Sequence, residues 1–295
     1  MSARAAEQLA ARLGGLIPAV PVPFRGSTLA EDAQQAYVRW MAGQAISGVA
    51  VWAHTGRGPY LAPGDRRTVL ATWRAALPGR VVVAGANSPH MAHEARAGGA
   101  DAVLAFPRRD DPVSYHRALG AELPVLAFYL YEAAGGVAYD PETLCRIMDL
   151  PEVVGIKIAT LDSVITFQSI AEILRAYPDK ALITGEDRFL GYSLMLGASG
   201  ALIGMGSALT DLQAQLLKAY VGEDYPAFHT LSARIDRFAA ATFTAPMEGY
   251  IRRMLWALAA ERVIPDDACD DPWGPPLDER DRSRVRSAVR EARAQ

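Results

Sequence analysis

A single lysine stands inside an otherwise apolar run, Val-Val-Gly-Ile-Lys-Ile-Ala at residues 153–159. Such a run predicts a strand buried on both faces, so Lys157 must reach solvent, pair with an acid or lose its proton. Burial lowers the pKa of a lysine because the charged form loses hydration, and a neutral amine can attack a ketone to form a Schiff base. Lys157 is therefore a candidate nucleophile. The alternative is a strand-end lysine that pairs with a carboxylate on the next element.

Two tyrosines lie near the end of the preceding apolar run, residues 124–131. Imine chemistry needs a group that moves protons to and from substrate or water, and a phenol can do this. Strand alternation places Tyr129 and Tyr131 on one face and Phe128 on the other. Either tyrosine is a candidate to face Lys157, and packing within the sheet is the structural alternative.

A polar, glycine-rich loop follows another buried run, with the sequence Trp-Ala-His-Thr-Gly-Arg-Gly at residues 52–58. Thr55, with the backbone around Gly56, could hold a carboxylate as an anion-binding nest does. His54 would add an imidazole, which serves both as a hydrogen-bond partner and as an acid or base. The alternative is an ordinary turn, because glycine and threonine are common turn residues.

The elements that must position these residues form an alternating series. Eight short apolar runs alternate with amphipathic stretches, several of which begin with proline, and this predicts a (β/α)₈ TIM barrel. An open doubly wound sheet is the competing fold, but no glycine-rich phosphate loop follows the first run. In a barrel the chemistry lies at the carboxyl ends of the strands, where Lys157 and Tyr129 both fall. The runs are 15–24, 48–55, 81–86, 102–106, 124–131, 153–159, 181–184 and 200–206.

The alternation stops after residue 222. The remaining sequence predicts three helices, at 227–242, 247–261 and 279–292, separated by Pro246 and a turn-rich segment. We therefore expect a barrel with a short N-terminal helix over residues 1–222 and a small C-terminal helical domain over residues 223–295.

Composition indicates an ordinary soluble protein. The chain has 295 residues, 51% of them hydrophobic, and its net charge is −3. The arginine-rich stretch 278–293 is interleaved with acids, so nucleic-acid binding is not expected. No apolar run approaches the length of a membrane span, and two distant cysteines, Cys145 and Cys269, suggest a reduced, cytoplasmic protein. His90 and His93 lack a nearby third ligand, so we expect no metal, and the proposed chemistry needs no cofactor.

Several segments, in order, resemble the dihydrodipicolinate synthase and N-acetylneuraminate lyase family of class I, Schiff-base aldolases. The resemblance implies that Tyr129, 28 positions before Lys157, is the catalytic tyrosine. It also implies that Gly185 and Leu202 line a keto-acid pocket, and that the barrels form a homotetramer or dimer. The matching segments are 19–24 to a first strand ending in Thr-Pro-Phe, 53–57 to a Gly-Thr-Thr-Gly-Glu loop, 155–157 to the Schiff-base segment, and 185–187 and 197–202 to the Gly-Asp-Asp and Gly-Ala-Asp-Gly-Val-Ile segments of strands seven and eight.

The chain also departs from the family pattern. His54 and Arg57 replace a threonine and a glutamate of the loop. The family's synthases have a relay tyrosine where this chain has Phe-Pro-Arg-Arg-Asp at 106–110, and an arginine that holds the aldehyde's carboxylate where it has Glu-Ala-Ala-Gly-Gly at 132–136.

We therefore predict a Schiff-base-forming lyase or aldolase that acts on pyruvate or another 2-oxo acid, with an aldehyde as partner in condensation. The reaction could be C–C cleavage, condensation or dehydration. The alternatives are the lysine-pathway enzyme 4-hydroxy-tetrahydrodipicolinate synthase and a barrel that binds a keto acid without catalysis.

Overall fold

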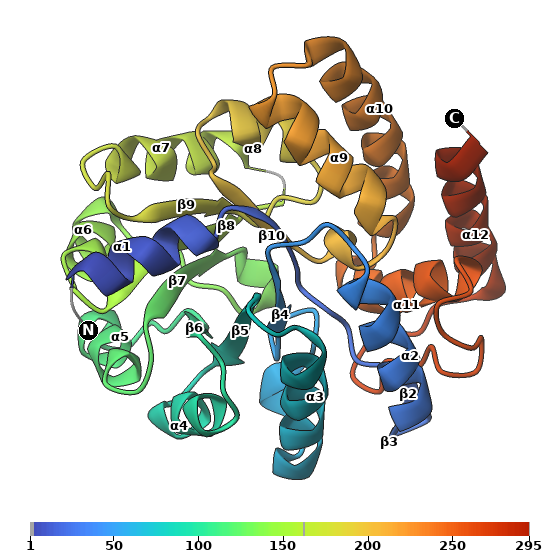
Figure 1. The fold of residues 1–295 in the computed structure, drawn as a ribbon, viewed down its shortest axis with the longest axis horizontal. Coiled ribbons are helices and arrows are strands. Elements are labelled where there is room, and N and C mark those ends of the chain that lie inside the picture. Colours follow the sequence, from blue (N-terminus) through green and yellow to red (C-terminus); the bar gives the residue numbers. More distant parts are fainter. Residues whose placement is uncertain (1–2, 162, 295) are drawn as a thin grey trace.

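The fold is a (β/α)₈ barrel, as the alternating pattern predicts. The computed structural model describes residues 3–161 and 163–294. Within them, eight parallel strands form one sheet in the order β1-β10-β9-β8-β7-β6-β5-β4, and a bridge between Ala19 and Ala50 brings β1 to β4 (Figure 1). The strands are β1 (Gly15–Pro18), β4 (Gly48–Val51), β5 (Val81–Ala86), β6 (Ala102–Ala105), β7 (Val125–Leu130), β8 (Val153–Ala159), β9 (Ala181–Thr184) and β10 (Gly200–Ile203).

Helices surround the strands and follow them in the alternating order that the sequence predicts. Proline opens several of them, where its missing N–H costs no helical hydrogen bond. A short hairpin of β2 (Phe24–Arg25) and β3 (Thr28–Leu29) interrupts the first connection. The barrel helices are α2 (Glu31–Ala42), α3 (Pro63–Ala76), α4 (Pro89–Ala97), α5 (Pro112–Gly120), α6 (Pro141–Met148), α7 (Val164–Leu174), α8 (Leu190–Met195) and α9 (Thr210–Val221).

The strands separate two hydrophobic cores. One lies inside the barrel and the other between strands and helices, so successive strand residues alternate between them. Helix α1 (Ala3–Arg12) crosses the barrel (Figure 1), and Leu9 and Leu13 belong to the inner core. The amino ends of the strands are thereby closed, which leaves the carboxyl ends as the open mouth.

The register of β7 decides which aromatic side chain enters the barrel. Phe128 lies opposite Lys157 on β8, and an irregularity at Val125 and Leu126 shifts the pairing. Phe128 belongs to the inner core, whereas Tyr129 packs against the outer one. The prediction that Tyr129 faces Lys157 is therefore wrong in this structure, because alternation turns Tyr129 outward.

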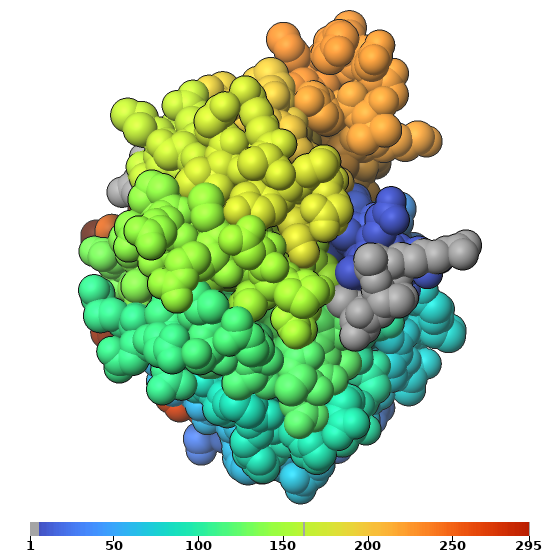
Figure 2. Space-filling model, turned by 90° about the vertical axis from the view of Figure 1, so that its left-hand side faces the viewer, coloured from blue at the N-terminus to red at the C-terminus, as the bar shows by residue number. Residues whose placement is uncertain are grey.

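Three C-terminal helices lie together at one side of the barrel (Figure 1). They are α10 (Tyr225–Thr242), α11 (Tyr250–Ala260) and α12 (Glu279–Ala294). Figure 2 shows a face covered by the middle of the chain, with α10 extending beyond it. Among the residues described, no helix is both long and apolar enough to cross a membrane.

A buried ion pair joins the segment before α12 to the barrel. Arg57 donates to both oxygens of Asp271, at 3.1 and 2.8 Å, and the two side chains are only 7% and 1% exposed. Removing one member of such a pair leaves the other charge buried and poorly compensated. The pair therefore fixes the C-terminal segment on the loop after β4.

We expect Asp271→Ala to lower the free energy of unfolding by about 3–5 kcal/mol, because Arg57 would lose its two-pronged partner. Chemical denaturation measures this change. The control is Asp267→Ala, which breaks the exposed pair of Asp267 with Arg25 and should cost far less, because solvent screens that pair. Equal costs for the two variants would show that the buried pair does not hold the segment in place.

Candidate active site

Lys157 lies near the carboxyl end of β8 in a narrow pocket, and it is 5% exposed. The pocket encloses a cavity of about 20 Å³, which is room for about one water molecule. A 2-oxo acid must therefore displace side chains in order to enter. The other residues that line the pocket are His54, Thr55, Phe128, Leu130, Tyr131, Ala159, Leu161, Gly185, Asp187, Gly204, Phe243 and Tyr250.

The surroundings of Lys157 favour its neutral form. Burial lowers the pKa of Lys157 to about 8, against the opposing influence of the Asp187 and Glu186 carboxylates. Its Nζ lies 4.3 Å from the centre of the Phe128 ring. In the described part of the chain, no carboxylate forms an ion pair with this amine. The structure therefore contradicts the alternative in which Lys157 forms an ion pair with a carboxylate on the next element.

Two buried acids follow β9. Asp187 accepts a hydrogen bond from the Met205 N–H at 2.7 Å, and Glu186 accepts from the backbone and hydroxyl of Thr160 at 2.6 and 3.0 Å. Burial raises the pKa of both carboxyls, to about 7 in each case. Glu186 thus fixes the loop after β8, while Asp187 lines the pocket beside Lys157.

Gly185 lines the Lys157 pocket, whereas Leu202 does not. A Cβ on Gly185 would lie 2.6 Å from Cε of Lys157 and 2.9 Å from Cβ of Ala159, so the glycine provides the space that the lysine occupies. Leu202 is buried in the inner core on β10 and does not line the pocket. Gly204, two residues further along, does line it.

The loop after β4 turns at a strained residue. Trp52 has φ of +54° although it is not glycine, and its indole N–H donates to the Arg66 carbonyl at 3.0 Å. A Cβ at Gly58 or Gly85 would overlap the Trp52 carbonyl, so both positions require glycine. Packing holds this conformation, which directs the next residues toward the barrel mouth. Gly56 lies within the turn and does not line the pocket.

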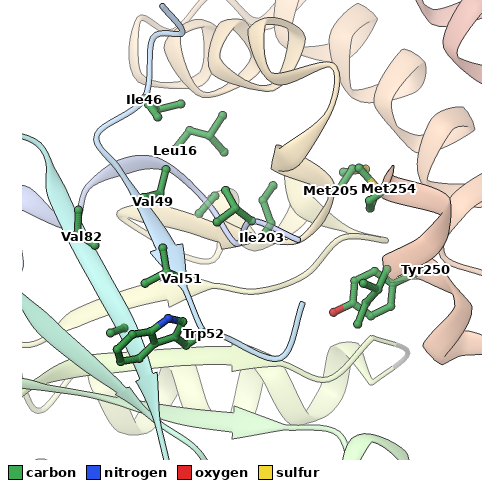
Figure 3. Packing of buried hydrophobic residues seen from close by; sticks show 14 of the residues in the cluster. Leu16, Ile46, Val49, Val51, Trp52, Val82, Ile203, Met205, Tyr250 and Met254 are labelled. Atoms are coloured by element: carbon green, nitrogen blue, oxygen red, sulfur yellow. The ribbon is translucent and has the colours of Figure 1, made fainter. Parts of the chain in front are cut away.

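His54 and Thr55 meet side chains from the C-terminal helices. The Tyr250 hydroxyl lies 3.0 Å from Nδ1 of His54 and 2.9 Å from Oγ1 of Thr55. Nε2 of His54 lies 3.2 Å from Oε2 of Glu248, and the Tyr131 hydroxyl donates to Oε1 of Glu248 at 2.9 Å. Figure 3 shows the Tyr250 hydroxyl pointing toward the loop after Trp52.

Glu248 is held as a carboxylate. Burial alone would raise its pKa, but the hydrogen bond and charge of His54, the Tyr131 hydroxyl and the charge of Arg57 together lower the pKa to about 2. Arg57 donates to Oε2 of Glu248 at 3.1 Å and is itself held by Asp271. Glu248 therefore has a fixed position and a fixed charge.

Tyr129 borders a different cavity. This second space, of about 800 Å³, shares Leu130, Tyr131, Leu161 and Phe243 with the Lys157 pocket. The shared side chains form a wall between the two spaces. Hydroxyl groups and a guanidinium on the outer side of this wall come from Tyr129, Thr160, Ser163, Thr166 and Arg188.

The structure brings together four of the predicted residues, namely Lys157, Thr55, His54 and Gly185, and leaves Tyr129, Gly56 and Leu202 outside the pocket. Sequence reasoning missed Phe243, Glu248 and Tyr250. They belong to a segment that no motif marks. The one usable signal was in the loop, where His54 and Arg57 together need an acidic partner.

No site for a metal is evident in the residues described, because no three His, Cys, Asp or Glu side chains gather as metal ligands. His90 and His93 are exposed on α4 and lie next to Glu94 and Glu122. The chemistry available in the pocket is that of an amine, hydroxyls, an imidazole and carboxylates.

Comparison with known proteins identifies the family of the chain. A model of the dihydrodipicolinate synthetase family matches residues 12–292. The 4-hydroxy-tetrahydrodipicolinate synthase of Oleidesulfovibrio alaskensis is 26% identical over 249 residues, which are 79% of this chain and 84% of that protein. The enzyme of the same name from Ruegeria pomeroyi is 29% identical over 250 residues, with the same two shares.

Solved structures share the fold. The dihydrodipicolinate synthase of Agrobacterium tumefaciens superimposes with a TM-score of 0.86 at 21% identity, over 96% of this chain and 99% of that one. The sialic acid aldolase of Ruminococcus gnavus gives 0.85 at 18% identity, over 96% and 98%. The chain therefore belongs to the dihydrodipicolinate synthetase family and is a class I aldolase or lyase.

Proposed function

We propose that the protein forms a Schiff base between Lys157 and pyruvate or another 2-oxo acid, and then makes or breaks a C–C bond, or eliminates water, beside the imine. The observation that carries this proposal is the buried, unpaired Lys157 with its lowered pKa, at the mouth of a barrel of this family. Such a lysine is nucleophilic near neutral pH.

The reaction follows from the groups in the pocket. The neutral amine of Lys157 attacks the keto carbon, and loss of water from the carbinolamine gives an imine. The protonated imine withdraws electrons from the adjacent carbon and so stabilises an enamine. The Thr55 hydroxyl, held by Tyr250, supports a role as anchor for the substrate carboxylate.

Borohydride trapping tests this proposal. The sequence contains three lysines, so peptide mapping after incubation with pyruvate and borohydride is unambiguous. We expect a reduced adduct on Lys157, and an adduct confined to Lys180 or Lys218 would contradict the proposal. A panel of other 2-oxo acids in the same assay would identify the acid that the pocket prefers.

Lysine-pathway synthesis is the second candidate, since relatives at 26–29% identity carry that name. The two positions that supply a tyrosine and an arginine in the family's synthases offer little here to hold the carboxylate of aspartate semialdehyde. Arg109 is exposed and lies outside the pocket, and the short helix η2 (Glu132–Ala134) after β7 contains no cation. We therefore propose that this protein is not the lysine-pathway synthase.

We expect aspartate semialdehyde not to be the preferred partner when pyruvate consumption is measured with a panel of aldehydes. The carboxylate of aspartate semialdehyde would find no cation at the position where the family's synthases have an arginine. The same panel tests the opposite outcome. A kcat/KM of at least ~10⁴ M⁻¹s⁻¹ with aspartate semialdehyde, higher than with the other aldehydes, would establish the synthase activity.

The assay also distinguishes catalysis from binding. A barrel that only binds a keto acid has no reason to form a reducible imine and would return the acid unchanged. For assembly we propose a homo-oligomer, a dimer or a tetramer. Support comes from apolar side chains exposed on α7 and α8, among them Ile165 at 76% and Met195 at 57%, and light scattering in solution would measure the mass.

A further inference from the structure

The strand β7, next to Lys157 on β8, places no proton-transfer group inside the pocket, and the hydroxyl of Tyr131, which follows this strand, already donates to Glu248. On β7 the side chain beside Lys157 is Phe128, and Tyr129 faces away from the pocket. Imine chemistry nevertheless requires protons to move to and from the substrate. The acid–base groups must therefore come from elsewhere in the pocket.

We propose that Tyr250, His54 and Glu248 form a hydroxyl–imidazole–carboxylate relay that moves protons at the Lys157 imine. The proposal rests on the Schiff-base function proposed above. The three groups are joined by contacts of 3.0 Å, from the Tyr250 hydroxyl to Nδ1, and 3.2 Å, from Nε2 to the carboxylate. Tyr250 and His54 line the pocket, whereas Glu248 acts through His54.

The hydrogen bonds give the relay a direction. Glu248 is ionised and can only accept, so Nε2 of His54 carries the proton in this contact. When the ring is neutral, Nδ1 accepts from the Tyr250 hydroxyl. The Thr55 hydroxyl, 2.9 Å from the Tyr250 oxygen, can then donate to that oxygen or, once substrate is bound, to its carboxylate. Protons can thus pass from the pocket through Tyr250 to His54.

The proton transfer is balanced. One C–H bond on the carbon beside the protonated imine breaks, and its electron pair forms the C=C bond of the enamine, while the C=N π pair returns to nitrogen. The Tyr250 oxygen takes this proton as its own hydroxyl proton passes to Nδ1 of His54. The resulting imidazolium is stabilised by Glu248, as in hydroxyl–imidazole–carboxylate triads. Return of the proton to a substrate oxygen or carbon completes the cycle.

Two departures from the family loop converge on this relay. His54 and Arg57, which replace a threonine and a glutamate of the family pattern, both contact Oε2 of Glu248, at 3.2 and 3.1 Å. Arg57 is anchored by Asp271. The loop and the segment before α11 therefore form one unit, and the C-terminal helices contribute side chains directly to the pocket.

Deuterium exchange at C3 of pyruvate tests the relay without a second substrate. In D₂O, NMR follows the loss of C3 protons, and borohydride trapping measures the equilibrium yield of imine in the same samples. We expect Tyr250→Phe, His54→Gln and Glu248→Gln to slow exchange by roughly 10²–10⁴-fold while they still trap pyruvate on Lys157. Glu248→Asp should recover part of the rate, because it restores a carboxylate.

The control is Tyr177→Phe, the same chemical change in the connection from α7 to β9 at the other end of the barrel, and it should exchange at the wild-type rate. Tyr129→Phe compares the two hypotheses, because the relay predicts a nearly unchanged rate and the family spacing predicts a loss of roughly 10²–10⁴-fold.

Normal exchange in the three relay variants would overturn the relay and leave the Schiff base intact. Absence of trapping in the wild-type protein, with every acid of the panel, would instead overturn the proposed function. Loss of both trapping and the folded circular-dichroism spectrum in a relay variant would assign its groups a structural role and would also count against the relay.

Discussion

Lys157→Met should abolish the imine and lower turnover by roughly 10⁴–10⁶-fold, the range typical of removing a covalent nucleophile. Methionine is unbranched and apolar, so it fills the space beside Phe128 and Gly185 that the lysine stem occupies. The pocket should survive, because Lys157 forms no ion pair whose loss would leave a charge unpaired. The measurement is mass detection of the trapped adduct together with the turnover rate on the 2-oxo acid found by the panel.

The matched control is Lys218→Met, which makes the same change on the exposed face of α9. It should keep both the adduct and the rate. If Lys157→Met retained turnover within about tenfold of wild type, another group would carry the chemistry and the Schiff-base proposal would fail.

The barrel could be predicted because its signals are local. Each apolar run contains one strand of the sheet, and the prolines at 63, 89, 112 and 141 open helices where the sequence places them. Lys157 was recognisable for the same reason, since one charged residue in a buried strand conflicts with its neighbours. Thr55 and His54 followed from a polar loop after a buried strand.

The orientation of β7 could not be predicted from alternation. Alternation separates Phe128 from Tyr129 but does not say which of them enters the barrel, and the register with β8 decides this. A spacing of 28 residues between Tyr129 and Lys157 counts positions along the chain and carries no information about the irregularity at Val125. The choice of Tyr129 therefore depended on a feature that only pairing of the strands reveals.

The contributions of Glu248 and Tyr250 were also hidden from the sequence. They lie about two hundred residues from His54 in the chain, and nothing in Pro-Met-Glu-Gly-Tyr at 246–250 resembles a motif. Their place at the barrel mouth results from packing of α11 against the barrel and from the pair of Arg57 with Asp271. Long-range contacts of this kind leave no periodic signal.

The rate of imine formation should rise about tenfold per pH unit up to pH about 8 and then level off. Only the neutral amine attacks, and burial lowers the pKa of Lys157 to about 8. Between pH 8 and pH 5 the rate should therefore fall by about 10³-fold. An exposed lysine would instead show a rate that is still rising at pH 10, because its pKa lies near ~10.4. Rapid-mixing trapping with borohydride across this pH range measures the profile.

The variant Asp187→Asn tests the direction in which this pH profile shifts when a nearby charge is removed. The Asp187 carboxylate raises the pKa of Lys157 by stabilising the ammonium, in opposition to burial. The asparagine keeps an oxygen that can accept the Met205 N–H, so the loop should hold its shape while the charge is removed. Because burial raises the pKa of Asp187 to about 7, its charge is present only above that pH. The upper part of the rising limb should then move to lower pH, and imine formation between pH 7 and pH 8 should become faster than in the wild-type protein. If the rising part of the profile moved to higher pH, or did not move, Asp187 would not act on Lys157 through its charge. The buried amine would then owe its reactivity to desolvation alone.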